Sequence, residues 1–209
     1  MKPLAECVLY TFIDAAYLRG REVATVAREL CEGGSDLIQL RAKDWPREKI
    51  EEAARAVIPI TRSNGVRLVI NDYLQIAESV GAEICHLGQE DFFEAGHQHM
   101  SQLRTKVAIG MSTHAPEQAG KAVLAGAEYV AIGPVYPTGT KPTAKPVTLE
   151  YVRWAAENVR IPWFAIGGIN LNTIDDVIAA GARRVCVVSA ILNSADVKAA
   201  CKELKSRLQ

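Results

Sequence analysis

Hydroxyl and ammonium groups follow a short apolar run in the second half of this chain. The run, Tyr129–Ile132, has the β-branched and aromatic residues of a buried strand. The loop after it, residues 133–142, contains Thr138, Gly139, Thr140 and Lys141. Hydroxyls, backbone N–H groups and an ammonium are the donors that a phosphorylated ligand needs. The alternative is a strand followed by an ordinary turn, and the other strand ends must decide between the two.

Small residues end the last two strand-like runs. Gly167 and Gly168 follow one of them, and Val188 and Ser189 end the other. In parallel α/β barrels, the loops after the seventh and eighth strands often hold a phosphate with glycine-rich backbone and a helix N-terminus. Gly168 lets the backbone approach an anion closely, while Val188 and Ser189 offer N–H groups. A tight turn without a ligand is the alternative interpretation of the two glycines.

Cations and carboxylates follow the runs in the first half of the chain. Gln39, Arg41 and Lys43 alternate, so their side chains share one side if the strand persists. Asp72 and Asp91 follow two further runs, and each alone would be interpreted as a helix cap. Two like charges about 4 Å apart repel by about 4 kcal/mol at an effective dielectric constant of about 20. Converging carboxylates therefore need a shared proton or a bridging cation, and hard oxygen ligands beside phosphate-binding cations predict Mg²⁺.

The histidines and cysteines give weaker evidence of a functional site. His114 follows Ser112 at a strand-like end, where it either lines the site or orients the loop. His97 and His99 lie in a polar segment without a further ligand, which favours solvated surface over a metal site. The five cysteines are scattered without a C-x-x-C pair, as expected for reduced thiols in a cytoplasmic protein. No Walker loop or GxGxxG motif follows a strand-like run.

Eight strand-like runs, each followed by a turn and an amphipathic segment, must position these residues. The runs are Cys7–Ile13, Leu37–Leu40, Arg67–Ile70, Glu83–Leu87, Lys106–Gly110, Tyr129–Ile132, Trp163–Ile166 and Arg184–Val188. Alternating strands and helices imply right-handed crossovers and a parallel sheet. An open doubly wound sheet usually has fewer strands, so we expect an α/β fold of the (β/α)₈ TIM-barrel class. No linker or composition break divides the chain, which predicts one domain over residues 1–209.

The charge balance limits the function classes. The chain has 24 basic and 24 acidic residues, whereas nucleic-acid and membrane-surface binders carry a clustered basic excess. The longest apolar runs are far shorter than the roughly 18 residues that span a membrane, and the first residues lack the features of a signal peptide. We therefore expect a cytoplasmic protein whose partners are small molecules. The sequence allows a homo-oligomer without requiring one.

Seven motifs, in the order of the strand-like runs, resemble those of the thiamine phosphate synthase family. They are QLRAK at 39–43, ND at 71–72, HLGQED at 86–91, GMSTH at 110–114, GPVYPTGTKP at 133–142, AIGGI at 165–169 and VVSAI at 187–191. The resemblance implies a (β/α)₈ enzyme that joins the two halves of thiamine. The nitrogen of thiazole phosphate would replace pyrophosphate on 4-amino-5-hydroxymethyl-2-methylpyrimidine diphosphate, by a dissociative reaction through a pyrimidine carbocation.

The resemblance also implies roles for individual residues. Arg41, Lys43 and Lys141 would hold the pyrophosphate and, with Ser112, form the catalytic set, while Asp72 and Asp91 would bind Mg²⁺. Gln39, Asn71 and Ser112 would orient the pyrimidine diphosphate. Leu40 and Ala42 would also belong to the substrate-binding residues. Thiazole phosphate would contact Thr138, Gly139 and Thr140, with its phosphate on Gly168, Val188 and Ser189.

The chain departs from the family pattern at a few positions, and two other functions are compatible with the fold. Tyr73 stands where family members often have Arg, and Ile84-Cys85 replaces Gly-Val. The related thiazole tautomerase, an isomerase, typically has His where this chain has Pro134, and it tends to lose the Gln-Glu-Asp element. A non-catalytic barrel that binds thiamine intermediates is the third interpretation, although it would have less need of a leaving-group clamp.

Overall fold

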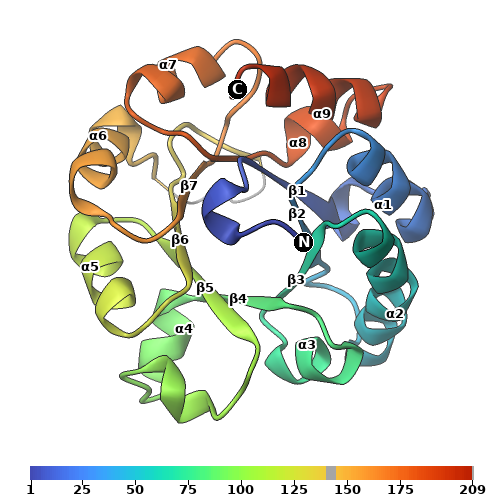
Figure 1. Ribbon diagram of the computed structural model, residues 1–209, viewed down its shortest axis with the longest axis horizontal. Helices are drawn as coiled ribbons and strands as arrows, with labels where there is room; N and C mark the ends of the chain where they lie inside the picture. Colours follow the sequence, from blue (N-terminus) through green and yellow to red (C-terminus); the bar gives the residue numbers. More distant parts are fainter. Residues whose placement is uncertain (140–144, 209) are drawn as a thin grey trace.

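The computed structural model describes residues 1–139 and 145–208. Within these residues, eight parallel strands close into a barrel in chain order, and helices surround it (Figure 1). The strands are β1 (Leu9–Asp14), β2 (Leu37–Arg41), β3 (Arg67–Asn71), β4 (Ile84–Gly88), β5 (Ala108–Thr113), β6 (Tyr129–Ile132), β7 (Trp163–Ile166) and β8 (Val185–Cys186). The expected (β/α)₈ class is therefore confirmed.

The barrel closes through the shortest strand. β8 has two residues instead of the five that the sequence predicts, and its two pairs with β1 are Leu9 with Val185 and Tyr10 with Cys186. Val187 still donates a backbone hydrogen bond to the Tyr10 carbonyl at 2.9 Å, but Val188 leaves the extended conformation with φ −116° and ψ −85°. The chain therefore turns into the next helix earlier than the apolar run indicates. β5 shows the opposite error, since it continues to Thr113 past the predicted end.

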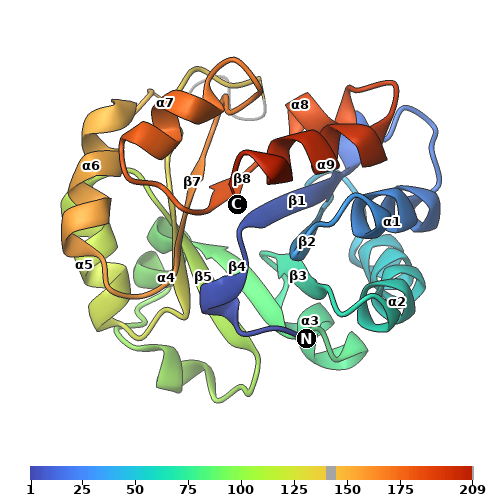
Figure 2. The same cartoon turned by 45° about the horizontal axis from the view of Figure 1, so that its top comes forward.

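The outer helices surround the strands of the barrel (Figure 2). They are α1 (Val23–Glu32), α2 (Arg47–Ser63), α3 (Leu74–Val80), α4 (Gln89–Glu94), α5 (Pro116–Leu124), α6 (Thr148–Asn158), α7 (Ile174–Ala179), α8 (Ser189–Leu192) and α9 (Val197–Ser206). The 3₁₀ turns η1 (Leu4–Glu6), η2 (Ala15–Tyr17) and η3 (Met100–Leu103) complete the elements. Pro46 precedes α2 and Pro116 begins α5, where a missing N–H costs no intrahelical bond. No helix among the described residues is long and apolar enough to cross a membrane.

Aromatic rings fill the middle of the barrel. Tyr10, Tyr129 and Phe164 are almost fully buried, and their ring centroids lie 5.3 to 5.8 Å apart in edge-to-face contacts. A Cβ atom at Gly110 would lie 2.1 Å from the Tyr129 ring. The glycine on β5 thus makes room for the tyrosine that pairs with it on β6.

A buried carboxylate secures the amino-terminal end of the barrel, where the first residues cross its centre (Figure 1). Asp36 accepts backbone hydrogen bonds from Val8 and Leu9 at 2.8 and 3.0 Å, and it pairs with Lys2 and Lys205 at 2.8 Å. Burial acts to raise the pKa of Asp36, but these four hydrogen bonds outweigh it and hold the pKa below its usual value. The ionised carboxylate therefore stabilises the fold.

We predict that Asp36→Asn lowers the free energy of unfolding at neutral pH by about 2 to 3 kcal/mol, because charged hydrogen bonds to a buried group are lost. Since the folded-state pKa lies below the unfolded value of about 3.9, this stabilisation exists above that pH and disappears as the pH falls through the folded-state pKa. Urea denaturation at several pH values measures the difference between wild type and variant. A difference that does not shrink in acid would contradict the assignment. Glu32→Gln, which breaks an exposed pair with Lys198, is the matched control and should show no comparable loss.

Candidate active site

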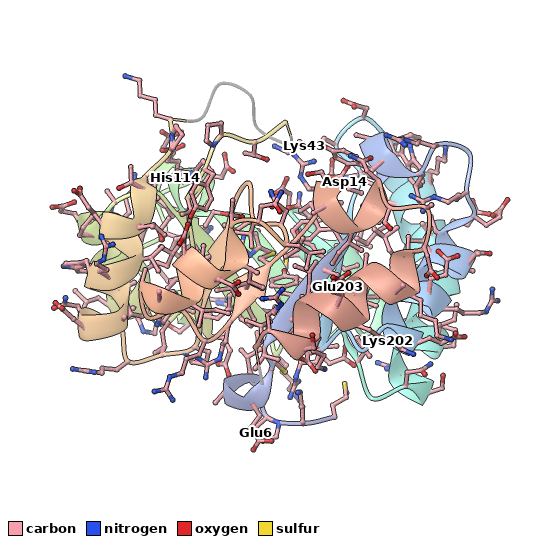
Figure 3. The ribbon with its side chains drawn as sticks, turned by 90° about the horizontal axis from the view of Figure 1, so that it is seen from above. Glu6, Asp14, Lys43, His114, Lys202 and Glu203 are labelled. Carbon is pink, nitrogen blue, oxygen red and sulfur yellow. The ribbon has the colours of Figure 1, made fainter. Side chains whose placement is uncertain are left out.

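A pocket opens at the carboxyl ends of the strands and receives lining residues from all eight of them. Figure 3 shows Asp14, Lys43 and His114 at this end of the barrel and Glu6 at the opposite end. This is the end at which (β/α)₈ enzymes carry their active sites. The predicted site residues that line it are Gln39, Arg41, Lys43, Asn71, Asp72, Asp91, Ser112, Thr138, Gly168, Val188 and Ser189.

Side chains of residues 39–43 alternate between the pocket and the hydrophobic core. Gln39, Arg41 and Lys43 line the pocket, as their spacing predicts. Leu40 and Ala42 are 1% and 5% exposed and belong to the hydrophobic core. Any contact of these two residues with a substrate therefore falls to their backbone atoms.

An ion pair holds Arg41 in place. Asp14 ends β1 directly opposite Arg41, and its carboxylate accepts a 2.7 Å hydrogen bond from the guanidinium. The other carboxylate oxygen accepts from the backbone N–H of Ala16 at 3.0 Å, so Asp14 is itself anchored. The Asp14 and Arg41 side chains are 2% and 13% exposed. Asp14 directly follows the predicted run Cys7–Ile13, but its partner depends on which strands are neighbours.

Two carboxylates line the pocket, Asp72 directly after β3 and Asp91 on α4. Asp72 is accessible from the pocket and accepts a 2.6 Å hydrogen bond from the Asn71 amide. Desolvation by surrounding atoms raises the pKa of Asp72, and the charge of Asp91 raises it further against the lowering effect of Lys43. A Cβ at Gly88 would lie 2.5 Å from an Asp91 carboxylate oxygen, so glycine permits this position. Among the described residues, no group of three or more His, Cys, Asp or Glu side chains could hold a metal.

The two histidines of the pocket have specific partners. His86 Nε2 lies 2.7 Å from Ser112 Oγ. The sequence predicts Ser112 as a site residue, but it does not predict this role for His86. His114 Nδ1 donates to the carbonyl of Gly133, and the ring also lines the pocket. Both roles considered for His114, lining the site and orienting a loop, are therefore combined in one side chain. A histidine two residues after the β4 start is a weak sequence signal, because most buried histidines are structural.

Glycines allow the loops after β6 and β7 to lie against each other. Val135 and Tyr136 donate backbone hydrogen bonds to the carbonyls of Ile166 and Gly167 at 2.8 and 3.1 Å. A Cβ at Gly167 would lie 2.4 Å from Pro134, and one at Gly168, where φ is +66°, would lie 2.6 Å from Tyr136. The two glycines therefore do more than form a turn, since they admit the backbone of the neighbouring loop.

The far end of the pocket is small and polar. Thr138, Gly168 and Ser189 line both the main pocket and an adjoining cleft, to which Gly139 also contributes. Ser189 begins α8, and Val188 precedes it. Thr140 and Lys141, for which the sequence also predicts ligand contacts, lie outside the described residues.

The fold and this pocket define the class of protein. It is a (β/α)₈ barrel in which the pocket at the carboxyl ends of the strands combines cations, carboxylates and glycine-rich loops. A family profile described as thiamine monophosphate synthase matches residues 9–191. The chain belongs to this family.

Individual relatives agree with this membership. A thiamine-phosphate synthase of Thermus thermophilus is 43% identical over 178 residues, which are 84% of each chain. That of Shouchella clausii is 36% identical over 100% of this chain and 98% of the relative. The structure of a thiamine phosphate pyrophosphorylase from Pyrococcus furiosus superposes with a TM-score of 0.86 and 30% identity, covering 98% of this chain and 96% of the other.

We predict that Asp14→Asn lowers kcat/KM about 10- to 100-fold, because the guanidinium of Arg41 loses the charge that orients it. The loss should appear mainly in KM for the pyrimidine diphosphate, the substrate whose pyrophosphate the resemblance assigns to Arg41. Steady-state kinetics with each substrate varied in turn measures it. Asp175→Asn, which removes an exposed pair with Arg207 on the outer helices, should leave the kinetics unchanged. Equal kinetics for Asp14→Asn and wild type would contradict the role given to Asp14.

Proposed function

We propose that this chain joins 4-amino-5-hydroxymethyl-2-methylpyrimidine diphosphate to thiazole phosphate, giving thiamine phosphate and pyrophosphate. The observation that supports this proposal is that one pocket is lined by two sets of polar groups, each suited to an anion. Arg41 and Lys43 lie with two carboxylates on one side, and glycine-rich loops with Thr138 and Ser189 lie on the other. A diphosphate leaving group and a monophosphate match these two sets, and the printed names of the relatives describe the same product.

Stabilisation of the leaving group is the main chemical task in this proposal. The bond between the pyrimidine methylene carbon and the diphosphate oxygen breaks, and the electron pair leaves with pyrophosphate. Arg41, oriented by Asp14, and Lys43 would bind the charge that develops there. No cysteine nucleophile is needed, and burial raises the pKa of the Cys85 thiol to about 12. All five cysteines are buried and free among the described residues, which also supports the proposed cytoplasmic location.

Asp72 and Asp91 would hold Mg²⁺. Their oxygens are the hard ligands that Mg²⁺ prefers, and the cation usually completes its coordination with substrate phosphates and water. The raised pKa of Asp72 supports this fit, because a nearby cation would offset both its desolvation and its repulsion by Asp91. Bound Mg²⁺ supplies positive charge for the departing pyrophosphate.

Capture of the pyrimidine carbocation by the thiazole nitrogen forms the new C–N bond. Phe12, Ala131 and Pro134 give the pocket an apolar wall, which would limit attack by water on the cation. The phosphate of the thiazole would rest on the backbone of Gly168 and Val188 and on Ser189. Thr140 and Lys141 are part of this proposal through the family resemblance alone.

Pro134 separates this proposal from the tautomerase alternative. It lines the pocket at the position where the tautomerase typically has His. A proline side chain cannot exchange a proton, so an isomerase mechanism would lack its acid or base at this position.

The decisive experiment incubates the purified protein with both substrates and Mg²⁺ and measures thiamine phosphate and pyrophosphate. Equal amounts of the two products are expected, with none when either substrate is omitted. A known synthase assayed in parallel verifies the reagents. If that control forms product and this protein does not, the proposed function is wrong.

We predict that Asp91→Ala raises the Mg²⁺ concentration for half-maximal activity about 10- to 100-fold, because one of two carboxylate ligands is lost. Binding of thiazole phosphate, measured by calorimetry, should stay within about twofold, since its site lies across the pocket. Glu90→Ala is the matched control, because this neighbouring carboxylate is exposed and does not line the pocket. Parallel loss of Mg²⁺ activation and thiazole phosphate binding would contradict two separate sites.

A further inference from the structure

A chain of hydrogen bonds crosses the barrel interior and joins two sides of the pocket. Gln39 Nε2 donates to Tyr10 Oη, and Tyr10 Oη lies 2.8 Å from Tyr129 Oη. Tyr129 Oη lies 2.8 Å from His86 Nδ1, and His86 Nε2 lies 2.7 Å from Ser112 Oγ. We call these five residues the interior chain. Its members come from five different strands, β2, β1, β6, β4 and β5 in that order.

The middle of the interior chain is sealed from solvent, whereas its ends reach the pocket. Tyr10 and Tyr129 are 1% and 0% exposed, while Gln39 and Ser112 line the pocket. Both buried hydroxyls take hydrogen-bond partners from the interior chain, and the two ends of this chain line the pocket. The hydroxyls therefore point to a task at the two ends of the chain.

The donor and acceptor roles in the interior chain can be assigned in order, starting from Gln39. A tyrosine hydroxyl has one proton, and an amide NH₂ group can only donate. With Gln39 donating, the Tyr10 proton goes to Tyr129, and the Tyr129 proton goes to His86 Nδ1. Burial raises the pKa of both tyrosines well above the usual value, so both keep these protons.

The same hydrogen-bond order determines whether Ser112 and Gln39 act as donor or acceptor toward the pocket. In this order His86 accepts at Nδ1, which places the proton of a neutral ring on Nε2, where it would be donated to Ser112 Oγ. The hydroxyl proton of Ser112 is then directed to the pocket as a donor. Gln39, having used an N–H on Tyr10, can present its carbonyl oxygen as an acceptor. The pocket thus offers one acceptor and one donor with set roles.

We propose that Tyr10, Tyr129 and His86 are positioning residues that set Gln39 as an acceptor and Ser112 as a donor for an aminopyrimidine. An aminopyrimidine has complementary groups, since its exocyclic N–H donates and its ring nitrogen accepts. This inference rests on the proposed function for the identity of the substrate. The hydrogen-bond order itself depends on the protein alone, so it can be tested separately.

Tyr129→Phe interrupts the interior chain and keeps the ring that fills the barrel. We expect KM for the pyrimidine diphosphate to rise about tenfold or more, the effect of losing an oriented buried hydrogen bond. KM for thiazole phosphate should stay within about twofold. Tyr10→Phe is a second cut, closer to Gln39, and should raise the same KM. An unchanged KM for the pyrimidine substrate in both folded variants would overturn the proposal.

Tyr151→Phe is the matched control for loss of a buried hydroxyl. Tyr151 is 4% exposed, and its hydroxyl bonds Thr113 Oγ1 at 2.8 Å and the Ala115 carbonyl at 2.7 Å, outside the interior chain. This variant should lose comparable stability in urea denaturation and keep both KM values. If it raised KM for the pyrimidine substrate as much as Tyr129→Phe does, the effect would be structural and the proposal would be wrong.

Combination with Ser112→Ala tests whether the chain acts through the serine. If it does, Tyr129→Phe should add less than about twofold to the loss already caused by Ser112→Ala, because interacting residues are non-additive. Multiplied losses would show that the tyrosine acts elsewhere and would contradict this part of the proposal.

Nitrogen NMR of the His86 ring separates failure of this inference from failure of the proposed function. Without any ligand, we expect a neutral ring with its proton on Nε2, and a change in the tautomer signal in Tyr129→Phe. A proton on Nδ1 in wild type would mean the reverse hydrogen-bond order and would overturn the proposal, whether or not thiamine phosphate forms. If the tautomer is as expected but no product forms, the proposed function alone fails.

Discussion

Closure of the parallel sheet brings the carboxyl ends of all strands to one rim, and the site depends on this constraint. β8 returns to β1 through two residue pairs, which makes the first and last strands neighbours. Side chains that alternate along each strand then point either into the barrel or toward the helices. Because of this geometry, Gln39, Arg41 and Lys43 share the pocket with Asp72, which follows β3, and with Asp91 on α4.

Several charged side chains lie close together at this rim, and each needs a partner of opposite charge to stabilise it. Arg41 is paired with Asp14, which keeps the guanidinium ordered without a ligand. Asp72 forms no comparable ion pair within the described part of the chain, and its raised pKa reflects desolvation and the charge of Asp91. The cationic and anionic parts of the pocket are thus prepared in different ways: one is ordered in advance, and the other would gain from a bound cation.

Local motifs predicted the barrel class, half of the pocket-lining residues and the shared side of Gln39, Arg41 and Lys43. These predictions succeed because strand periodicity and strand-end chemistry are properties of short segments. The Asp14–Arg41 pair spans 27 residues and the Tyr10–Tyr129 contact spans 119, so neither has a local signal. The length of β8 was predicted wrongly because Val187 and Val188 are as apolar as strand residues, while the backbone of Val188 already turns away.

By itself, the sequence determined the class of fold and which residue types stand at the strand ends, including the glycines at 110, 167 and 168. The tertiary structure alone decided their partners. It showed that Gly110 accommodates the Tyr129 ring and that the glycines after β7 admit the loop of β6. It also joined Ser112 to His86 and to the buried tyrosines. The physical reason is that hydrogen-bond roles and close packing depend on which strands are neighbours around the closed barrel.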